Sequence, residues 1–310
     1  MEKIITITLN PAIDKTTCTE KIAPEKKLRC VHPTYEPGGG GINVSRALEH
    51  LGCQSLAMYF AGGFNGNFFK KLLTKENIKS VVVPVKTNIR TNIIIVEKTT
   101  GLQYRFGMES GAVMQKDWKA FLKKLEQQEG FEYVVASGSL PEGVPLDFFG
   151  RVASIVKNKN AKLIVDTSGE ALKEAVKVGV FLLKPNIGEL SNLYGKENLE
   201  QSEIITAAKS IINNGGCEIM VISMGKDGAI LVTKDENYHL TAPEVVVKST
   251  VGAGDSMVAG MVLAVSKGWP MKDVLRYGIA CGTAATINSG TALCKKEDVE
   301  CIFKELKEKI

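Results

Sequence analysis

The second half of the chain alternates regularly between helix-like and strand-like segments, and this pattern constrains the fold most strongly. From about residue 116, four predicted helices each precede a short apolar run typical of a strand. The helices are expected at 116–127, 146–157, 169–177 and 203–213, and the strands at 133–137, 162–166, 181–184 and 219–223. Because strands separated by helices favour a parallel sheet with helices on both faces, the pattern predicts an α/β fold.

The first half of the chain fits the same plan with two departures. Strands are expected at 4–9 and 55–60, and helices from the glycine-rich stretch to residue 51 and over 66–75. Residues 88–97 and 103–108 are typical of a hairpin. In the second half of the chain, β-rich segments are expected at 228–233 and 245–247, after the last strand of the alternating pattern. The segments at about 15–36 and 86–110 are predicted to combine into a small β-lid. No composition break marks a linker, so residues 1–310 are predicted to form one domain.

Composition excludes several classes of protein. The 310 residues are 44% hydrophobic and 24% charged, with a net charge of +5 spread along the chain. This charge is too small and too dispersed to predict binding to nucleic acid. The longest apolar run, 257–265, is too short to span a bilayer, so no membrane association is expected. Seven cysteines without a CxxC pair indicate free thiols in a reducing cytoplasm.

The stretch 250–256, Thr-Val-Gly-Ala-Gly-Asp-Ser, combines small residues with one carboxylate at the start of a predicted helix. The first N–H groups of a helix lack internal partners and favour an anion, which glycine allows to come close. Asp255 in the first turn would repel a bound phosphate, but it suits a general base that deprotonates a substrate hydroxyl during phosphoryl transfer. The alternative is that Asp255 only caps the helix and the glycines only make a turn.

A second glycine-rich stretch, 38–41, also precedes a predicted helix. It lacks the spacing of the Rossmann fingerprint and of the P-loop, so it is either a flexible loop or another place where a ligand approaches the backbone. Asp14 follows the first predicted strand and is either a turn residue or a substrate contact. Arg90 and Arg105 lie on the predicted hairpin and could bind a phosphate if the hairpin covers a pocket.

Three short motifs follow predicted strands and are therefore expected at one edge of the sheet: 137–141, 184–189 and 223–228. Asn186 and Glu189 lie three residues apart at a predicted helix start and could face one site. Glu189 could hold Mg²⁺ directly or through water, since magnesium prefers oxygen ligands, or it could simply cap the helix. The loop 223–228 could receive a nucleotide or form a hairpin turn.

These motifs resemble the ribokinase-like sugar kinases, the family often called PfkB. Residues 249–256 carry the most specific signature, and 38–44 and 184–189 support it over nearly the whole chain. Within the family, residues 24–30, 36–41 and 103–106 look most like the minor bacterial type of 6-phosphofructokinase. Gly40 stands where 1-phosphofructokinases and tagatose-6-phosphate kinases usually carry lysine. The resemblance implies a three-layer α/β/α sandwich with a mainly parallel sheet and a small β-lid.

The resemblance also implies an activity, ATP-dependent phosphorylation of fructose 6-phosphate at O1, and a role for each matching residue. Asp255 would be the base, and the anion hole would consist of Gly252, Ala253 and Gly254. The residues expected to contact ATP are Lys184, Asn186, Ser223, Gly225, Gly228 and Thr250, with Glu189 holding Mg²⁺ through water. The residues expected to bind the sugar or its phosphates are Asp14, Lys27, Gly39, Asn43, Arg90, Arg105 and Ser139.

The family resemblance implies two further properties. A monovalent cation, K⁺, would bind at Ser249, Val251, Ala285, Asn288 and Gly290, although Ala292 stands where relatives often carry a longer residue. The lid would pair with its twin to form a homodimer.

Rival functions remain open at this point. Within the family these are 1-phosphofructokinase and tagatose-6-phosphate kinase. A non-catalytic nucleotide-binding regulator would not need the intact Asp255 motif, and a dinucleotide-dependent dehydrogenase would need G-x-G-x-x-G after the first strand, which is absent.

Overall fold

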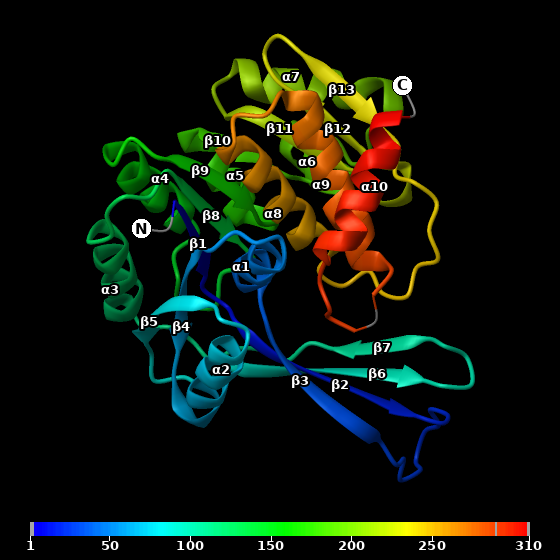
Figure 1. Cartoon of the computed structure of the whole chain (residues 1–310). Coiled ribbons are helices and arrows are strands. Elements are labelled where there is room, and N and C mark those ends of the chain that lie inside the picture. Colours follow the sequence, from blue (N-terminus) through cyan, green and yellow to red (C-terminus); the bar gives the residue numbers. More distant parts are fainter. Residues whose placement is uncertain (1–2, 289, 309–310) are drawn as a thin grey trace.

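A computed structural model describes residues 3–288 and 290–308 of the chain. Within these residues a nine-stranded sheet forms the centre of the molecule (Figure 1). Its strands, from one edge to the other, are β13 (Asn237–Leu240), β12 (Ala229–Val232), β11 (Cys217–Ser223), β10 (Val180–Leu183), β9 (Lys162–Asp166), β8 (Tyr133–Ser137), β1 (Ile4–Thr8), β4 (Leu56–Ala61) and β5 (Lys79–Pro84). The pairs from β11 to β5 are parallel, and within the described strands of this sheet only the pairs that involve β12 are antiparallel.

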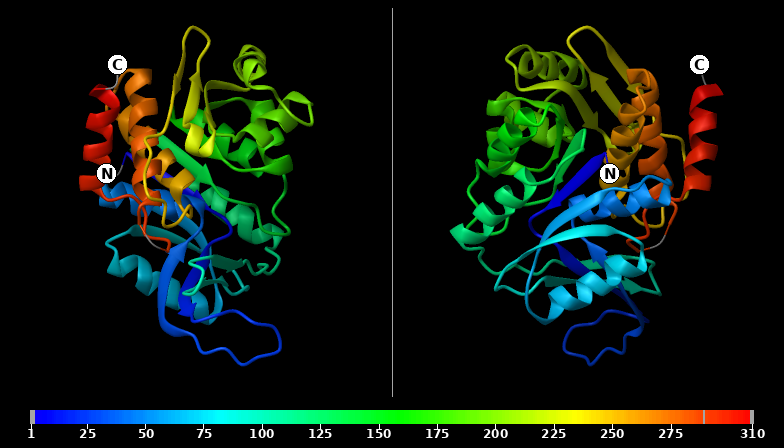
Figure 2. Two further views of the ribbon diagram at one scale, coloured as in Figure 1. Left: turned by 90° about the vertical axis from the view of Figure 1, so that its right-hand side faces the viewer. Right: turned by 60° about the vertical axis from the view of Figure 1, so that its left-hand side comes forward.

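Helices cover both faces of this sheet. One layer contains α3 (Gln115–Glu126), α4 (Phe148–Asn158), α5 (Gly169–Val178), α6 (Ile187–Tyr194) and α7 (Ile204–Asn213). The opposite layer contains α1 (Gly40–His50), α2 (Gly63–Lys75), α8 (Ala253–Ser266), α9 (Met271–Thr286) and α10 (Lys296–Glu308). Figure 2 shows the two helical layers on opposite sides of the strands. The predicted three-layer α/β/α architecture is therefore confirmed.

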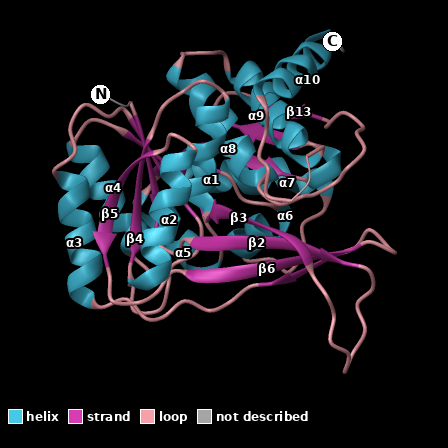
Figure 3. Cartoon of the chain, turned by 60° about the horizontal axis from the view of Figure 1, so that its bottom comes forward, coloured by secondary structure: helices cyan, strands magenta, loops and turns pink. Residues whose placement is uncertain are grey.

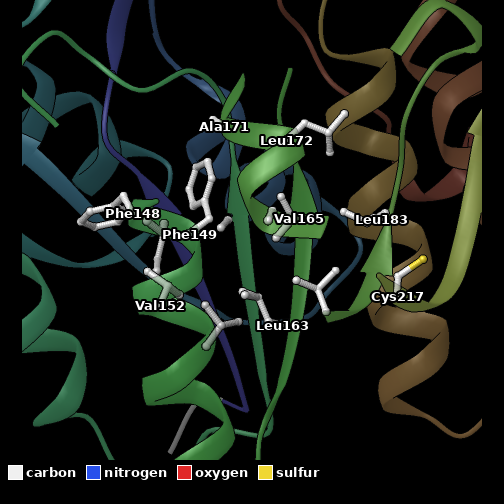
Figure 4. Packing of buried hydrophobic residues seen from close by; sticks show 14 of the residues in the cluster. Phe148, Phe149, Val152, Leu163, Val165, Ala171, Leu172, Leu183 and Cys217 are labelled. Carbon is white, nitrogen blue, oxygen red and sulfur yellow. The ribbon is translucent and has the colours of Figure 1, made fainter. Parts of the chain in front are cut away.

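The central strands are apolar on both faces because helices pack against each side. Val134 and Val135 are neighbours on β8, point to opposite faces and are both fully buried. On one side, Phe148, Phe149 and Val152 of α4 pack near β9 (Figure 4). Each such side chain contributes roughly 1.5–3 kcal/mol through burial, so the sheet is a rigid support for the loops at its edge.

A second sheet of four strands projects from the large one (Figures 1 and 3). Its strands, in spatial order, are β3 (Val31–Gly38), β2 (Ala12–Thr19), β6 (Arg90–Glu97) and β7 (Gln103–Phe106). The two outer pairs are antiparallel, and the central pair β2–β6 is parallel. In this register Asp14 lies directly between Glu36 of β3 and Asn92 of β6, so the three residues share one face of the sheet.

The secondary structure differs from the expected one in several places. Residues 245–247 form no strand, and Val246 and Val247 are 82% and 57% exposed, because no neighbouring strand pairs with this segment in the described chain. The edge strand is instead β13, which was not predicted because its short sequence with alternating polar residues is a weak sequence signal for a strand. Strand β5 and helices α9 and α10 were also not predicted. Among the described residues, none of the helices combines the length and apolar character that crossing a membrane requires.

Candidate active site

The carboxyl ends of β8, β9 and β10 meet the start of α8 at a polar cavity of about 310 Å³. Its lining residues come from five separate parts of the chain: Gly40, Ser137, Gly138, Ser139, Asp166, Thr167, Ser168, Glu189 and Asp255. Ligands of open α/β sheets bind at this edge of the strands. The cavity thus brings together the predicted residues Asp255, Glu189 and Ser139.

Asp255 lies in the first turn of α8 and is held by two neighbouring side chains. Its Oδ2 accepts a hydrogen bond of 2.9 Å from Asn43 Nδ2, and its Oδ1 accepts one of 3.5 Å from Ser137 Oγ. Burial, followed by repulsion from Asp166, raises the pKa of Asp255 to about 6, although Asn43, Lys184 and Ser137 oppose the rise. A carboxylate with this pKa is ionised at neutral pH and basic enough to accept a proton.

Lys184 is buried close enough to Asp255 to interact with it electrostatically, and its Nζ forms an ion pair of 3.1 Å with Asp166 Oδ1. Burial lowers the pKa of Lys184, but the nearby carboxylates of Asp166, Asp255 and Glu189 outweigh it and raise the pKa overall. A Cβ added at Gly254 would lie 3.6 Å from Lys184 Nζ, so the ammonium is beside the helix start. A positive charge therefore lies beside the amides that begin the helix.

The start of α8 needs glycine for steric reasons. Gly252 caps the helix with φ +74°, and a Cβ there would lie 2.4 Å from Leu293 Cδ2. The Ser256 N–H donates to Gly252 O at 2.8 Å, so the amides between them are those that begin the helix. Such amides lack helical partners and can donate to an anion. The predicted placement of residues 252–254 at a helix start is confirmed.

A second cavity, of about 680 Å³, adjoins the start of α8. Its lining includes predicted ATP contacts and members of the helix start: Ser223, Gly225, Gly228, Thr250, Ala253 and Gly254. The rest of the wall is mostly apolar and comes from the 242–247 segment, α8 and α9, including Val247, Met257 and Ile279. A mostly apolar pocket with a few polar groups at one end suits a nucleobase near a phosphate site.

Asn186 and Glu189 cap the start of α6 reciprocally. Asn186 Oδ1 accepts from the Glu189 N–H, and Glu189 Oε2 accepts from the Asn186 N–H, both at 2.9 Å. Glu189 therefore caps the helix, as the alternative interpretation of this residue predicted. Glu189 also lines the cavity beside Asp255, so capping fixes its position at the site rather than removing it.

The glycine-rich stretch 38–41 packs tightly against the ends of β1 and β8. Gly39 has φ +112°, and a Cβ there would lie 2.8 Å from Thr8 Cγ2. A Cβ at Gly40 would lie 2.2 Å from Ser137 Oγ, beside Asp255. These contacts explain the run of glycines, which places Asn43 of α1 against the carboxylate.

The small sheet supplies a separate polar group next to this loop. Asp14 is buried, and its Oδ1 accepts a 2.8 Å hydrogen bond from Asn92 Nδ2. Burial raises the pKa of Asp14 above its ordinary value, although the hydrogen bond from Asn92 and the charges of Arg46 and Arg90 partly oppose the rise. Arg90 Nη1 donates to Met108 O at 3.2 Å and to Asn92 Oδ1 at 3.4 Å.

Arg90 is also joined to the main sheet edge. Its Nη2 donates to Asn10 O at 3.5 Å, and Asn10 Nδ2 donates to Ser139 Oγ at 3.0 Å. Arg90 Nε is buried without a hydrogen-bond partner among the described residues. The structure thus brings Asp14, Arg90 and Ser139 together.

Two other predicted residues lie elsewhere. Arg105 on β7 reaches across to the nucleotide side, where its Nη2 donates to Thr250 Oγ1 at 3.4 Å. Lys27 is exposed on the loop between β2 and β3. Because β2 runs from the Asp14 end to Thr19, that loop is at the far end of the small sheet. Within one chain, Lys27 is separate from the other candidates.

Two loops meet where a monovalent cation was predicted. The Ser249 N–H donates to Thr286 O at 3.2 Å, and Val251 N–H donates to Ser249 Oγ at 3.2 Å. Asn288 Nδ2 donates to Ala284 O and Leu293 O. Ser249, Val251, Ala285, Asn288 and Gly290 therefore belong to adjoining segments.

The sequence over residues 2–298 matches the family described as pfkB family carbohydrate kinase. The chain belongs to this family. The expected family relationship is thus confirmed. The chain is 39% identical to the ATP-dependent 6-phosphofructokinase isozyme 2 of Escherichia coli K12, over 99% of each chain. It is 34% identical to the 1-phosphofructokinase of Bacillus subtilis 168, over 98% of each chain.

The fold of this pfkB-family kinase agrees with that relationship. Phosphofructokinase-2 from Escherichia coli, solved in complex with potassium, superposes with a TM-score of 0.95 at 40% identity, covering 99% of this chain and 100% of that one. The chain is therefore a carbohydrate kinase with a ribokinase-like fold, and membership of a kinase family implies ATP and a divalent metal ion.

The polar cavity of the kinase fits a hydrated divalent ion. Asp166 and Glu189 line it and offer carboxylate oxygens, which Mg²⁺ prefers. In the described part of the chain no three His, Cys, Asp or Glu side chains are grouped closely enough to hold a metal by themselves. An ion here would therefore retain several waters, as magnesium usually does.

Sequence reasoning missed three residues of this site: Asp166, Asn10 and Asn92. Asp166 ends a predicted strand at the same sheet edge as the three motifs, so its position could have identified it. Asn10 and Asn92 matter only through contacts with Ser139, Arg90 and Asp14 that depend on how the two sheets meet.

Proposed function

We propose that this kinase transfers the γ-phosphoryl group of ATP to O1 of fructose 6-phosphate, giving fructose 1,6-bisphosphate and ADP. The observation that carries the proposal is Asp255, a carboxylate with raised pKa at a glycine-lined helix start, beside the buried Lys184. Identity of 39% over the full length with a protein named 6-phosphofructokinase isozyme 2 supports the choice of substrate.

In the proposed reaction, Asp255 accepts the proton of the O1 hydroxyl as that oxygen attacks the γ-phosphorus. The bond from phosphorus to the bridging oxygen breaks, and its electron pair leaves with ADP. The amides of Gly252, Ala253 and Gly254 would donate to the transferring phosphoryl group, whose charge the Lys184 ammonium would partly neutralise. Asn43 and Ser137 hold Asp255 in place for the proton transfer.

Nucleotide binding is assigned to the cavity of about 680 Å³. Its apolar wall would contact the base, and the residues toward the phosphates would be Ser223, Gly225, Gly228, Thr250, Lys184 and Asn186. Mg²⁺, held through water by Glu189 and Asp166, would neutralise phosphate charge. K⁺ bound by the loops of Ser249 and Asn288 would fix the segment that precedes the anion hole.

Sugar binding is assigned to the edge of the small sheet, which would act as the lid. Asp14, Gly39, Asn43 and Ser139 would contact the sugar, and Arg90 would bind its existing phosphate. Arg105 lies against Thr250 and would approach the phosphates from the lid side. Binding of a phosphate by guanidinium groups is strong because the hydrogen bonds are charge-assisted.

Relatives named 1-phosphofructokinase support an alternative substrate, fructose 1-phosphate. The glycine loop fits this alternative less well than it fits fructose 6-phosphate. A Cβ at position 40 would already lie 2.2 Å from Ser137 Oγ, so this loop leaves no room for the lysine usual in that group. The loop therefore favours the 6-phosphofructokinase assignment, and tagatose 6-phosphate remains a candidate for the assay.

Two chains are proposed to pair through their small sheets. On the face opposite Asp14, one row across the sheet contains Tyr35, Lys15, Ile93 and Phe106. Tyr35 and Phe106 are 40% and 48% exposed, which suits an interface. Pairing at this sheet is also the arrangement in which Lys27 could serve a phosphate site of the partner. The unpaired thiols of the cysteines are consistent with a cytoplasmic location.

Product analysis tests the assignment of the reaction. With MgATP and fructose 6-phosphate, ³¹P NMR should show a new phosphate ester on C1 while the C6 ester remains. Fructose 1-phosphate as the only accepted substrate would instead support the alternative function.

A further inference from the structure

Asn92 is placed between the two groups that are assigned to the sugar phosphate. It faces Asp14 in the parallel pairing of β2 with β6, and Arg90 lies two residues earlier on the same face of β6. Its Nδ2 donates to Asp14 Oδ1 at 2.8 Å, and its Oδ1 accepts from Arg90 Nη1 at 3.4 Å. The same Oδ1 accepts from the Met108 N–H at 3.4 Å.

Only one orientation of the Asn92 amide satisfies all of these partners. The carboxylate of Asp14 can only accept, while the guanidinium of Arg90 and the N–H of Met108 can only donate. Rotating the amide by 180° would place donor against donor and acceptor against acceptor. The amide orientation is thus determined by its neighbours, and the amide in turn fixes them.

We propose that Asn92 is a positioning residue that fixes the Asp14 carboxylate and the Arg90 guanidinium relative to each other, so that the site selects a sugar that already carries a phosphate. This inference rests on the proposed function, which assigns Asp14 to the sugar and Arg90 to its phosphate. A sugar phosphate then meets both groups in one preset geometry, whereas an unphosphorylated sugar uses only one of them. Preset geometry increases affinity because fewer side chains must be ordered on binding.

The test compares wild-type kinase with Asn92→Ala, using fructose 6-phosphate and unphosphorylated fructose as separate substrates. Loss of hydrogen bonds to charged groups should lower kcat/KM for fructose 6-phosphate roughly ten- to a hundredfold. The KM for ATP should change less than about twofold, and activity toward fructose should fall less than activity toward fructose 6-phosphate. Thr91→Ala, on the opposite face of β6, is the matched control and should retain wild-type kinetics.

A double-mutant cycle distinguishes positioning from a general loss of structure. If Asn92 acts through Arg90, Asn92→Ala should cost much less in the Arg90→Ala background than in wild type. Asn92→Asp should be impaired as well, because it retains an oxygen for Arg90 but places a second carboxylate against Asp14. Additive effects in the cycle, or equal losses for ATP and sugar phosphate, would overturn the inference.

Failure of the proposed function would be visible in the wild-type enzyme itself. A wild type that phosphorylates no sugar phosphate overturns both the function and the role of Asn92. An active wild type with an unchanged Asn92→Ala variant overturns only the role of Asn92.

Discussion

Asp255 is surrounded by groups with opposite effects on its charge, and their balance predicts a pH dependence. Burial and Asp166 raise its pKa from an ordinary value near 3.8 to about 6. Because only the ionised form can accept a proton, kcat/KM should fall about tenfold per pH unit below pH 6 and level off above about pH 7. A pH–rate profile measures this, and a profile flat from pH 5 to 8 would contradict the general-base role.

The same pKa shift predicts a cost in stability. A carboxyl group whose folded pKa is raised destabilises the folded state when ionised, so its contribution worsens as pH rises from about 4 through 6. Asp255→Asn should therefore increase the free energy of unfolding by up to about 3 kcal/mol at pH 8 and much less at pH 4. Denaturant titrations at both pH values measure the difference. An equal change at both pH values would show that the ionised charge is not the cause.

The proposed role of Arg90 predicts a change in KM for the sugar phosphate but not for ATP. Arg90→Ala should raise the KM for fructose 6-phosphate by roughly ten- to a hundredfold, because charge-assisted hydrogen bonds to the phosphate are lost. The KM for ATP should stay within about twofold. Arg151→Ala, on the exposed side of α4, is the control. Equal increases in both KM values would argue against a phosphate clamp.

At the scale of elements, a buried arginine joins two helices of one layer to the small sheet. Arg46 of α1 is 2% exposed; its Nε donates to Glu76 Oε2 at 2.6 Å, and its Nη2 donates to Glu36 Oε1 at 3.2 Å. Its Nη1 donates to Pro37 O at 3.0 Å. These contacts connect α1, which carries Asn43, to the end of α2 and to β3 of the small sheet.

Removing one charge of this network should destabilise the fold. Glu76→Gln should lower the free energy of unfolding by about 2 kcal/mol, less than for a fully buried pair because Glu76 remains partly exposed. Glu126→Gln at the exposed end of α3 is the control, and denaturant titration measures both. A change as small as the control's would mean that the Arg46 network does not hold the elements together.

Elements with a strong local pattern were predictable from the sequence. The strands β8 and β9 were predicted at their observed bounds because both faces are apolar and helices flank them. The prediction of a β-segment at 245–247 was wrong because apolar β-type residues do not make a strand without a pairing partner.

Within the site, the helix start at Gly252 was predictable because a small-residue motif and a helix follow each other in sequence. The hydrogen bond from Asn43 to Asp255 joins residues 212 positions apart. The motif around Asp255 indicated the carboxylate, but only the family resemblance indicated Asn43 as well. Asn92 and Asn10 carried no sequence signal, since their importance comes from the register of β2 with β6 and from the contact between the sheets.

At the scale of the whole molecule, the exposed row on the small sheet predicts an assembly state. Light scattering should give the wild type twice the 33.6 kDa chain mass. Phe106→Asp should give the single-chain mass, because a charge would be buried at the interface. Leu146→Asp, at an exposed position away from this sheet, should leave the assembly unchanged. A Phe106→Asp variant that keeps the wild-type mass would place the interface elsewhere.

The most direct test of the proposed function measures ADP release from MgATP with fructose 6-phosphate, fructose 1-phosphate, tagatose 6-phosphate and ribose. We predict the highest kcat/KM for fructose 6-phosphate and a loss of at least roughly 10²-fold in kcat for Asp255→Ala, with substrate binding retained. Preference for another sugar phosphate would keep the mechanism and contradict the substrate assignment. Turnover that survives in Asp255→Ala would contradict the central claim that this carboxylate is the base.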